Sequence, residues 1–182
     1  MATWNSRGLR GSALEELINE AHEAYRRAGL GLIQKIPTPI TPIQMDKESR
    51  HITLAYFDKK STVDYIGVIQ GIPVCFDAKE CASDTFPLHN IHEHQVAFMR
   101  DFEAQDGVAF LLLSFTNRQS FMYLPFRDMM RFWERGQQGG RKSFLYDELD
   151  PSFIIHSKGM IQVHYLEALQ RDLSLREAKG SL

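Results

Sequence analysis

The chain has 182 residues, of which 43% are hydrophobic and 24% are charged, and these proportions exclude a wholly disordered protein. The formal net charge of −2 lacks the strongly basic balance of many nucleic-acid-binding proteins. No apolar run approaches the roughly 20 residues of a membrane span, and two cysteines are too few for a disulfide framework, so we expect one cytoplasmic domain over residues 1–182 that binds no membrane.

The N-terminal third predicts a helix, a strand and an extended excursion. Residues 14–25 carry apolar side chains at helical spacing, and Gly29 follows as a helix end. Residues 32–36 favour a strand that the next prolines terminate. Residues 40–60 are polar and mix basic with aromatic side chains, which indicates a hairpin with its tip at 46–49.

The rest of the chain predicts a mixed sheet flanked by helices, an α/β fold. A turn at Gln70-Gly71 joins two strands, and the apolar run 108–113 is typical of a strand buried on both faces. Asn90 is a suitable cap for the helix that follows it. The expected strands are 63–69, 73–79, 108–113 and 120–124, and the later helices are 91–102, 126–135 and 164–175, with a glycine-rich loop at 136–140.

Two aspartates are expected to face each other across the central hairpin. If the turn is centred between Gln70 and Gly71, Asp64 and Asp77 lie directly opposite, with Cβ atoms about 4.5–5.5 Å apart. Carboxylates this close repel unless they share a proton or a cation, and Mg²⁺ prefers such oxygen ligands. Lys79 would point to the same face, where an ammonium could hold a water and offset phosphate charge. The alternative is a surface hairpin whose charges are merely solvated.

Glu15 has two interpretations. Ser12 and Glu15 have the spacing of a capping box, in which the glutamate accepts a hydrogen bond from the main chain of Ser12. Glu15 also lies at the border of the apolar face of its helix, from which it could reach a metal ion on the sheet. The pattern alone favours the cap.

A glutamine and three histidines precede or begin the second helix. Gln95 interrupts the apolar stripe of this helix, so its side chain needs a partner, either the main chain of the sheet or a substrate phosphate or water. His89, His92 and His94 suggest zinc, but no cysteine has a recognised ligand spacing with them, and we do not favour a zinc site.

A basic segment occupies the last third of the chain. Arg127, Arg131 and Arg135 are spaced to share one helix face, and Arg141 and Lys142 follow the glycine-rich loop. These residues are a candidate phosphate-contacting patch. A solvated helix face explains the same pattern equally well.

Several motifs together resemble a known family. The segments Thr62-Val63-Asp64-Tyr65-x-Gly67 and Phe76-Asp77-Ala78-Lys79-Glu80 resemble the Asp…(Asp/Glu)-x-Lys core of the restriction-endonuclease-like nuclease superfamily. Further segments narrow the resemblance to the RecU family of Holliday junction resolvases. They are Arg10-Gly11-x-x-Leu14-Glu15, Lys35-Ile36-Pro37-Thr38-Pro39, Thr85-Phe86-Pro87-Leu88-x-Asn90-x-His92-x-His94-Gln95, Ala104-Gln105-Asp106-Gly107 and Gly140-Arg141-Lys142-Ser143, followed by Asp147-Glu148-Leu149.

The resemblance implies a restriction-endonuclease-like fold, roles for particular residues, and a protruding stalk formed by residues 40–60 of a single nuclease domain. Asp64, Asp77, Glu15 and the carbonyl group of Ala78 would bind Mg²⁺, with Mn²⁺ as a substitute, and these acids would act with the catalytic residues Lys79 and Gln95. Asp77 stands where the family motif commonly has Glu, and the superfamily accepts either acid. The DNA-binding residues would be Arg7, Arg10, Lys35, Lys47, Arg50, Lys59, Lys60, Arg141 and Lys142.

The function implied is that of a structure-selective endonuclease that resolves DNA four-way junctions by metal-dependent phosphodiester hydrolysis. We expect a homodimer, with recombination or branch-migration proteins as further partners. Two alternatives stay open at this point: a different nuclease with the same fold, and a non-catalytic junction-binding protein of recombination.

Overall fold

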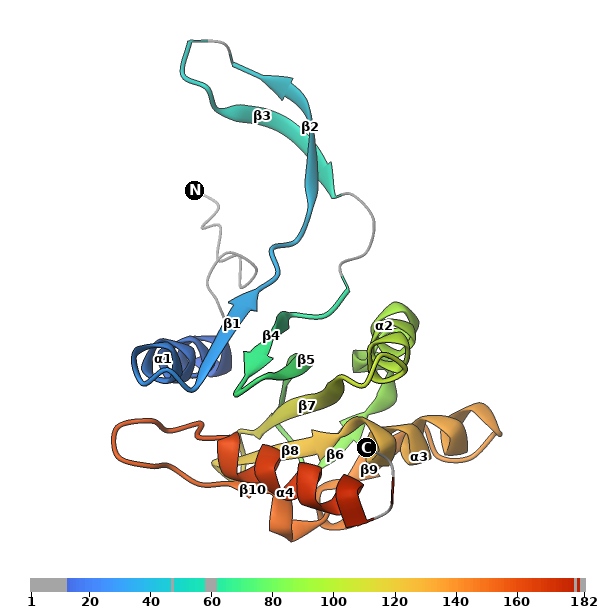
Figure 1. Ribbon diagram of the computed structural model, residues 1–182. Coiled ribbons are helices and arrows are strands. Elements are labelled where there is room, and N and C mark those ends of the chain that lie inside the picture. The colour runs from blue at the N-terminus through green and yellow to red at the C-terminus, as the bar shows by residue number, and fades with distance from the viewer. Residues whose placement is uncertain (1–12, 47, 58–61, 179, 181–182) are drawn as a thin grey trace.

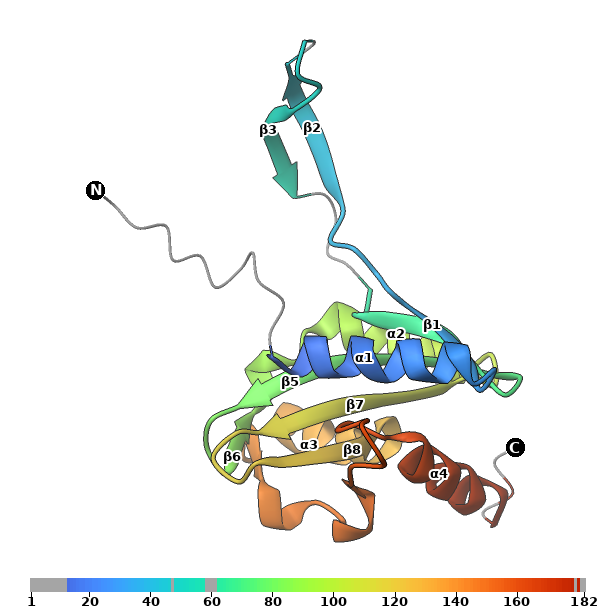
Figure 2. The same cartoon turned by 90° about the vertical axis from the view of Figure 1, so that its left-hand side faces the viewer.

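The computed structural model describes residues 13–46, 48–57, 62–178 and 180, and its centre is a six-stranded mixed sheet (Figures 1 and 2). The strands are ordered β1-β4-β5-β7-β8-β10, and only β5 and β7 among these neighbours run parallel. The mixed α/β architecture expected from the sequence is therefore confirmed. The strand bounds are β1 Gly31–Lys35, β4 Tyr65–Ile69, β5 Ile72–Cys81, β7 Val108–Phe115, β8 Ser120–Pro125 and β10 Ile154–Ile155.

Helices cover both faces of this sheet. One face packs against α1 (Ala13–Arg27) and α4 (Leu166–Ala178), and the other packs against α2 (Glu93–Glu103) and α3 (Phe126–Gln137). Because the parallel strands β5 and β7 need a long crossover, α2 lies in the connection between them. The sheet is thus buried on both sides at its centre, and every residue of β7 is buried.

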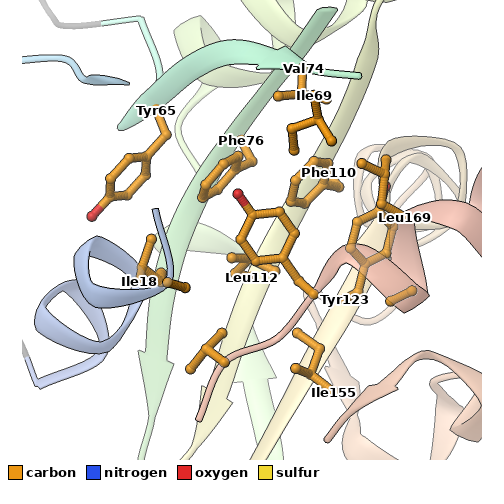
Figure 3. Close-up of a cluster of buried hydrophobic side chains, with 14 of the residues drawn as sticks. Ile18, Tyr65, Ile69, Val74, Phe76, Phe110, Leu112, Tyr123, Ile155 and Leu169 are labelled. Carbon is orange, nitrogen blue, oxygen red and sulfur yellow. The ribbon is translucent and has the colours of Figure 1, made fainter. Parts of the chain in front are cut away.

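A row of aromatic rings crosses the sheet on the face covered by α1 and α4. Tyr65, Phe76, Phe110 and Tyr123 come from four adjacent strands, and their rings stack with centroids 4.8, 4.6 and 4.3 Å apart (Figure 3). Offset stacking adds to the hydrophobic free energy of burial, so the row ties the four strands together. It also fixes Tyr65, which directly follows Asp64.

The hairpin β4–β5 has the register expected from its two-residue turn. Ile69 pairs with Ile72, and Tyr65 pairs with Phe76. Gln70 and Gly71 both have positive φ angles, of 48° and 86°, which suits a tight hairpin turn. The next pair outward in this register is Asp64 with Asp77.

The segment after β1 forms a second, two-stranded sheet that projects from the body (Figures 1 and 2). Strands β2 (Ile40–Met45) and β3 (Ile52–Phe57) pair antiparallel, and the main-chain N–H of Asp46 donates to the carbonyl oxygen of His51 at the tip. We call this hairpin the stalk. Several of its large apolar side chains are exposed, among them Ile43 and Met45.

Three expectations about element boundaries are wrong. Asn90 belongs to a 3₁₀ turn and does not cap α2, which begins after His92. Helix α3 continues to Gln137, and α4 begins at Leu166. The sequence analysis also missed strands of two or three residues, which are too short for a periodic pattern: β10 and the pair β6 (Thr85–Pro87) and β9 (Ser143–Leu145).

Gly67 allows β1 to approach β4 closely, and we expect Gly67→Ala to be strongly destabilising. A Cβ atom at this position would lie 2.3 Å from the carbonyl oxygen of Leu32 and 2.6 Å from the Cα of Ile33. The strands would have to separate, so the free energy of unfolding should fall by about 3 kcal/mol or more, which urea denaturation would measure. Val68→Ala, at an exposed neighbour, is the control; equal losses would contradict this explanation.

Candidate active site

Asp64 and Asp77 are joined through the main chain at the open end of the β4–β5 hairpin. The N–H of Asp64 donates to Oδ1 of Asp77 at 2.9 Å, and the N–H of Ala78 donates to Oδ2 of Asp64 at 3.0 Å. Asp77 is completely buried, whereas Asp64 is partly exposed. Each carboxylate is therefore oriented by the neighbouring strand, as the hairpin register predicts.

Burial and the neighbouring carboxylate make Asp64 costly to charge. Burial, followed by the charge of Asp77, raises the pKa of Asp64 to about 6, although the N–H of Ala78 and the charge of Lys79 act in the opposite direction. Oδ2 of Asp77 is buried and accepts no hydrogen bond within the described part of the chain. The Lys79 ammonium lies 2.6 Å from this oxygen and supplies the positive charge that the pair needs.

This pair fits a hard divalent cation. It offers carboxylate oxygens, one of them buried without a hydrogen bond, and an unfavourable concentration of negative charge that a cation would relieve. Among the residues that the structure describes, however, no three His, Cys, Asp or Glu side chains are already arranged to hold a metal ion.

Glu15 approaches from the other face of the sheet. Alternation along β5 places Asp77 and Lys79 on the face covered by α2, whereas Glu15 belongs to α1 on the opposite face. Its Oε2 lies 2.5 Å from Nζ of Lys35. Ser12, the partner expected for a capping box, lies outside the described residues.

The charges of all three acids act on Tyr65, although Glu15 lies on the opposite face of the sheet from Asp77. Burial raises the pKa of the Tyr65 hydroxyl well above its usual value, and the charges of Glu15, Asp64 and Asp77 raise it further. The hydroxyl donates to Oδ1 of Asn19, one turn after Glu15 on α1. The sequence did not identify Tyr65 as part of the site, because it has the pattern of an ordinary core residue.

Gln95 is a helix-capping residue in this structure. Its side chain is buried, and Oε1 accepts a hydrogen bond from the N–H of His92 at 3.0 Å, a main-chain partner at the start of α2 and not on the sheet. The contact satisfies one of the main-chain groups at the start of α2. The rings of His92 and His94 stack with centroids 5.4 Å apart.

The expected DNA-binding residues are distributed over separate regions. Arg50 is exposed at the stalk tip, and Lys142 is exposed beside a groove of about 520 Å³ that Trp133 also lines. Arg141 donates to the Ser143 hydroxyl at 3.0 Å. Lys35 is paired with Glu15 as described above, and the remaining five lie outside the described residues: Arg7, Arg10, Lys47, Lys59 and Lys60.

The arginines of α3 do not form one continuous basic patch. Arg127 is paired with the buried Asp172 of α4, and Arg135 binds Glu148 at 2.7 Å and the carbonyl oxygen of Ser143. Only Arg131 of the three is largely exposed. Two of the three side chains therefore stabilise the fold, which supports the structural interpretation of the pattern over the phosphate-contacting one.

A further contact links α1 to β5. Oε1 of Glu80 accepts a hydrogen bond from the N–H of Leu14 at 2.9 Å. The two residues are 66 positions apart, so no local spacing in the sequence could have indicated this contact.

Comparisons with known proteins agree on one family. A family model described as "RecU: Recombination protein U" matches residues 9–171. The protein named Holliday junction resolvase RecU from Levilactobacillus brevis is 39% identical over 172 residues, covering 92% of this chain and 86% of the relative. That of the same name from Bacillus pumilus is 42% identical over 144 residues, with 77% and 69% covered.

One solved structure is also similar in part. It is Hjc, a Holliday junction resolvase from the archaeal hyperthermophile Archaeoglobus fulgidus, with 9% sequence identity and a TM-score of 0.41 over 62% of this chain and 77% of that chain. Across the described residues, no helix combines the length and the apolar character needed to cross a membrane.

Proposed function

This chain belongs to the RecU family, and we propose that it is a Holliday junction resolvase, an endonuclease that cuts DNA four-way junctions. The observation that carries the proposal is the Asp64–Asp77 pair with Lys79 beside it, placed on a chain whose relatives bear that name. A buried acid pair that needs a cation is costly to keep for stability alone. It is useful where a metal ion and a phosphate must meet.

The residues that would hold the metal are Asp64, Asp77, Glu15 and the carbonyl group of Ala78, with Mg²⁺ as the ion and Mn²⁺ as a substitute. When bound, the metal would polarise the scissile phosphate and lower the pKa of a water molecule. To join the site, Glu15 would move away from Lys35, whose ammonium its Oε2 now contacts. Lys35 would then be available to a DNA phosphate.

Lys79 and Gln95 would act beside the metal. Lys79 already lies against the carboxylate of Asp77, so its ammonium is held where it can position a water and offset phosphate charge. Gln95 would act by fixing the first turn of α2. The DNA would be contacted by the exposed Arg50 and Lys142, with Arg141, Arg7, Arg10, Lys47, Lys59 and Lys60 as further contacts.

The test is cleavage of synthetic DNA. A four-way junction, a linear duplex and a flap of equal length are incubated with the protein, with Mg²⁺ and with EDTA. The proposal expects paired cuts in the junction only with metal. Equal cleavage of all three substrates would indicate a different nuclease, and junction binding without cleavage under any metal would indicate a non-catalytic recombination protein.

The stalk should matter mainly for junctions. Its basic and aromatic residues suit phosphates and exposed bases at a branch point, and a plain duplex has no open centre to receive a projection. Shortening the Met45–Arg50 tip should therefore weaken junction binding and cleavage much more than duplex binding. The affinities are compared at one fixed salt concentration, because phosphate contacts depend strongly on salt. Equal losses on both substrates would make the stalk a general electrostatic contact.

We further propose that the protein is a homodimer in the cytoplasm that works with recombination or branch-migration proteins. A junction offers two strands related by approximate two-fold symmetry, and one active site in each of two subunits matches that geometry. Light scattering should give twice the monomer mass, both free and on a junction. A monomer in both measurements would contradict this proposal.

A further inference from the structure

Glu80 lies next to the candidate active site, and no role has been assigned to it above. It follows Lys79 in β5, and alternation along the strand directs the two side chains to opposite faces of the sheet. Lys79 meets Asp77, whereas Glu80 turns toward α1. The end of β5 therefore contacts the acid pair on one face of the sheet and the first turn of α1 on the other.

The contact that Glu80 makes is with the main chain of α1. Its Oε1 accepts the N–H of Leu14 at 2.9 Å. Leu14 is the second residue of the helix, so this N–H has no acceptor within α1, and a negative charge at this end of a helix is favourable. Glu80 thus provides a cap from a distant strand and attaches the first turn of α1 to β5.

This attachment fixes the main chain just before Glu15. The N–H that Glu80 holds belongs to the peptide between Ala13 and Leu14, one peptide before the one that joins Leu14 to Glu15. Asp77 precedes Glu80 by three residues on the same strand. Together with the packing of α1 on the sheet, this hydrogen bond therefore helps to fix the separation between the α1 acid and the β5 acid, and a metal site tolerates errors of only about 0.5 Å in such a separation.

We infer that Glu80 is a positioning residue, which fixes Glu15 relative to Asp64 and Asp77 so that the three acids can bind one divalent cation. This inference rests on the proposed function. Positioning requires an oxygen that accepts the N–H of Leu14 and a side chain as long as that of glutamate. The charge of Glu80 is secondary, because the side chain faces away from the Asp77 carboxylate.

Three variants of the full chain distinguish the effect of the length of the Glu80 side chain from the effect of its charge. The quantity measured is Mn²⁺ affinity, by calorimetry without DNA. Glu80→Gln keeps the acceptor oxygen and should bind Mn²⁺ like the wild type. Glu80→Asp keeps the charge but loses one methylene, and Glu80→Ala loses the acceptor, so both should bind about 10- to 100-fold more weakly. Glu16→Ala, an exposed acid of the same helical turn, is the control and should bind normally.

The outcomes are distinct. Unchanged Mn²⁺ affinity in Glu80→Asp and Glu80→Ala, with only a lower melting temperature, would make Glu80 a simple helix cap and overturn the inference. Equal weakening in Glu80→Gln and Glu80→Ala would also overturn it, because charge would then be the cause. If Glu80→Ala fails to fold, the Gln and Asp variants decide. Junction cleavage by the wild type is scored separately, so failure of the resolvase proposal is recognised independently of the metal affinities.

Discussion

Asp77→Asn is expected to abolish junction cleavage while leaving the fold intact. The asparagine keeps an oxygen that can accept the N–H of Asp64, so the hairpin contact survives. It removes the buried negative charge that attracts the metal and leaves Asp64 and Glu15 as the acids of the site. Cleavage of a labelled four-way junction in Mg²⁺ should fall below detection.

The stability of this variant gives a second readout. Neutralising Asp77 relieves its repulsion with Asp64, and this gain offsets the loss of the ion pair with Lys79. In EDTA the melting temperature should therefore equal or exceed that of the wild type. Added Mg²⁺ should raise the melting temperature of the wild type only. Cleavage at the wild-type rate would refute the assignment of Asp77 as a metal ligand.

Lys79→Ala should lose about 10²–10⁴ in cleavage rate, the usual loss when a positioned acid–base or water-holding group is removed. Nζ of Lys79 lies 2.6 Å from Oδ2 of Asp77, and the Lys79 side chain is mostly buried. A cation from solvent would have to be desolvated to take the place of this ammonium. Metal binding should be retained or strengthened, because the metal no longer competes with the ammonium for this oxygen.

The measurement is single-turnover cleavage at saturating enzyme, with Mn²⁺ affinity by calorimetry on the same sample. Lys158→Ala is the matched control: it removes a lysine that is also paired with a carboxylate, that of Glu167, in the segment between β10 and α4. Unchanged turnover in Lys79→Ala would return this residue to the role of a solvated charge. A complete loss of metal affinity would show that it stabilises the acid pair rather than the reaction.

The sequence predicted the acid pair because the interactions involved are local. A two-residue turn at Gln70-Gly71 sets the register of the hairpin, and the register alone places Asp64 opposite Asp77. The 3.6-residue period of α1 likewise follows from side chains three or four positions apart. The boundaries of α2 and α3 were predicted less well, because the last turn of a helix depends on which neighbour satisfies its main-chain groups.

Only the tertiary structure decided which partner each charged side chain takes. Lys35 meets Glu15, Glu80 meets the main chain of Leu14, and Arg127 meets Asp172, over separations of 20, 66 and 45 residues. Such contacts depend on how whole elements pack on the two faces of the sheet, and the free energy of that packing is spread over many side chains. The sequence by itself therefore determined that acidic and basic residues are present at these positions. The fold determined which of them form structural ion pairs and which lie beside the candidate metal site.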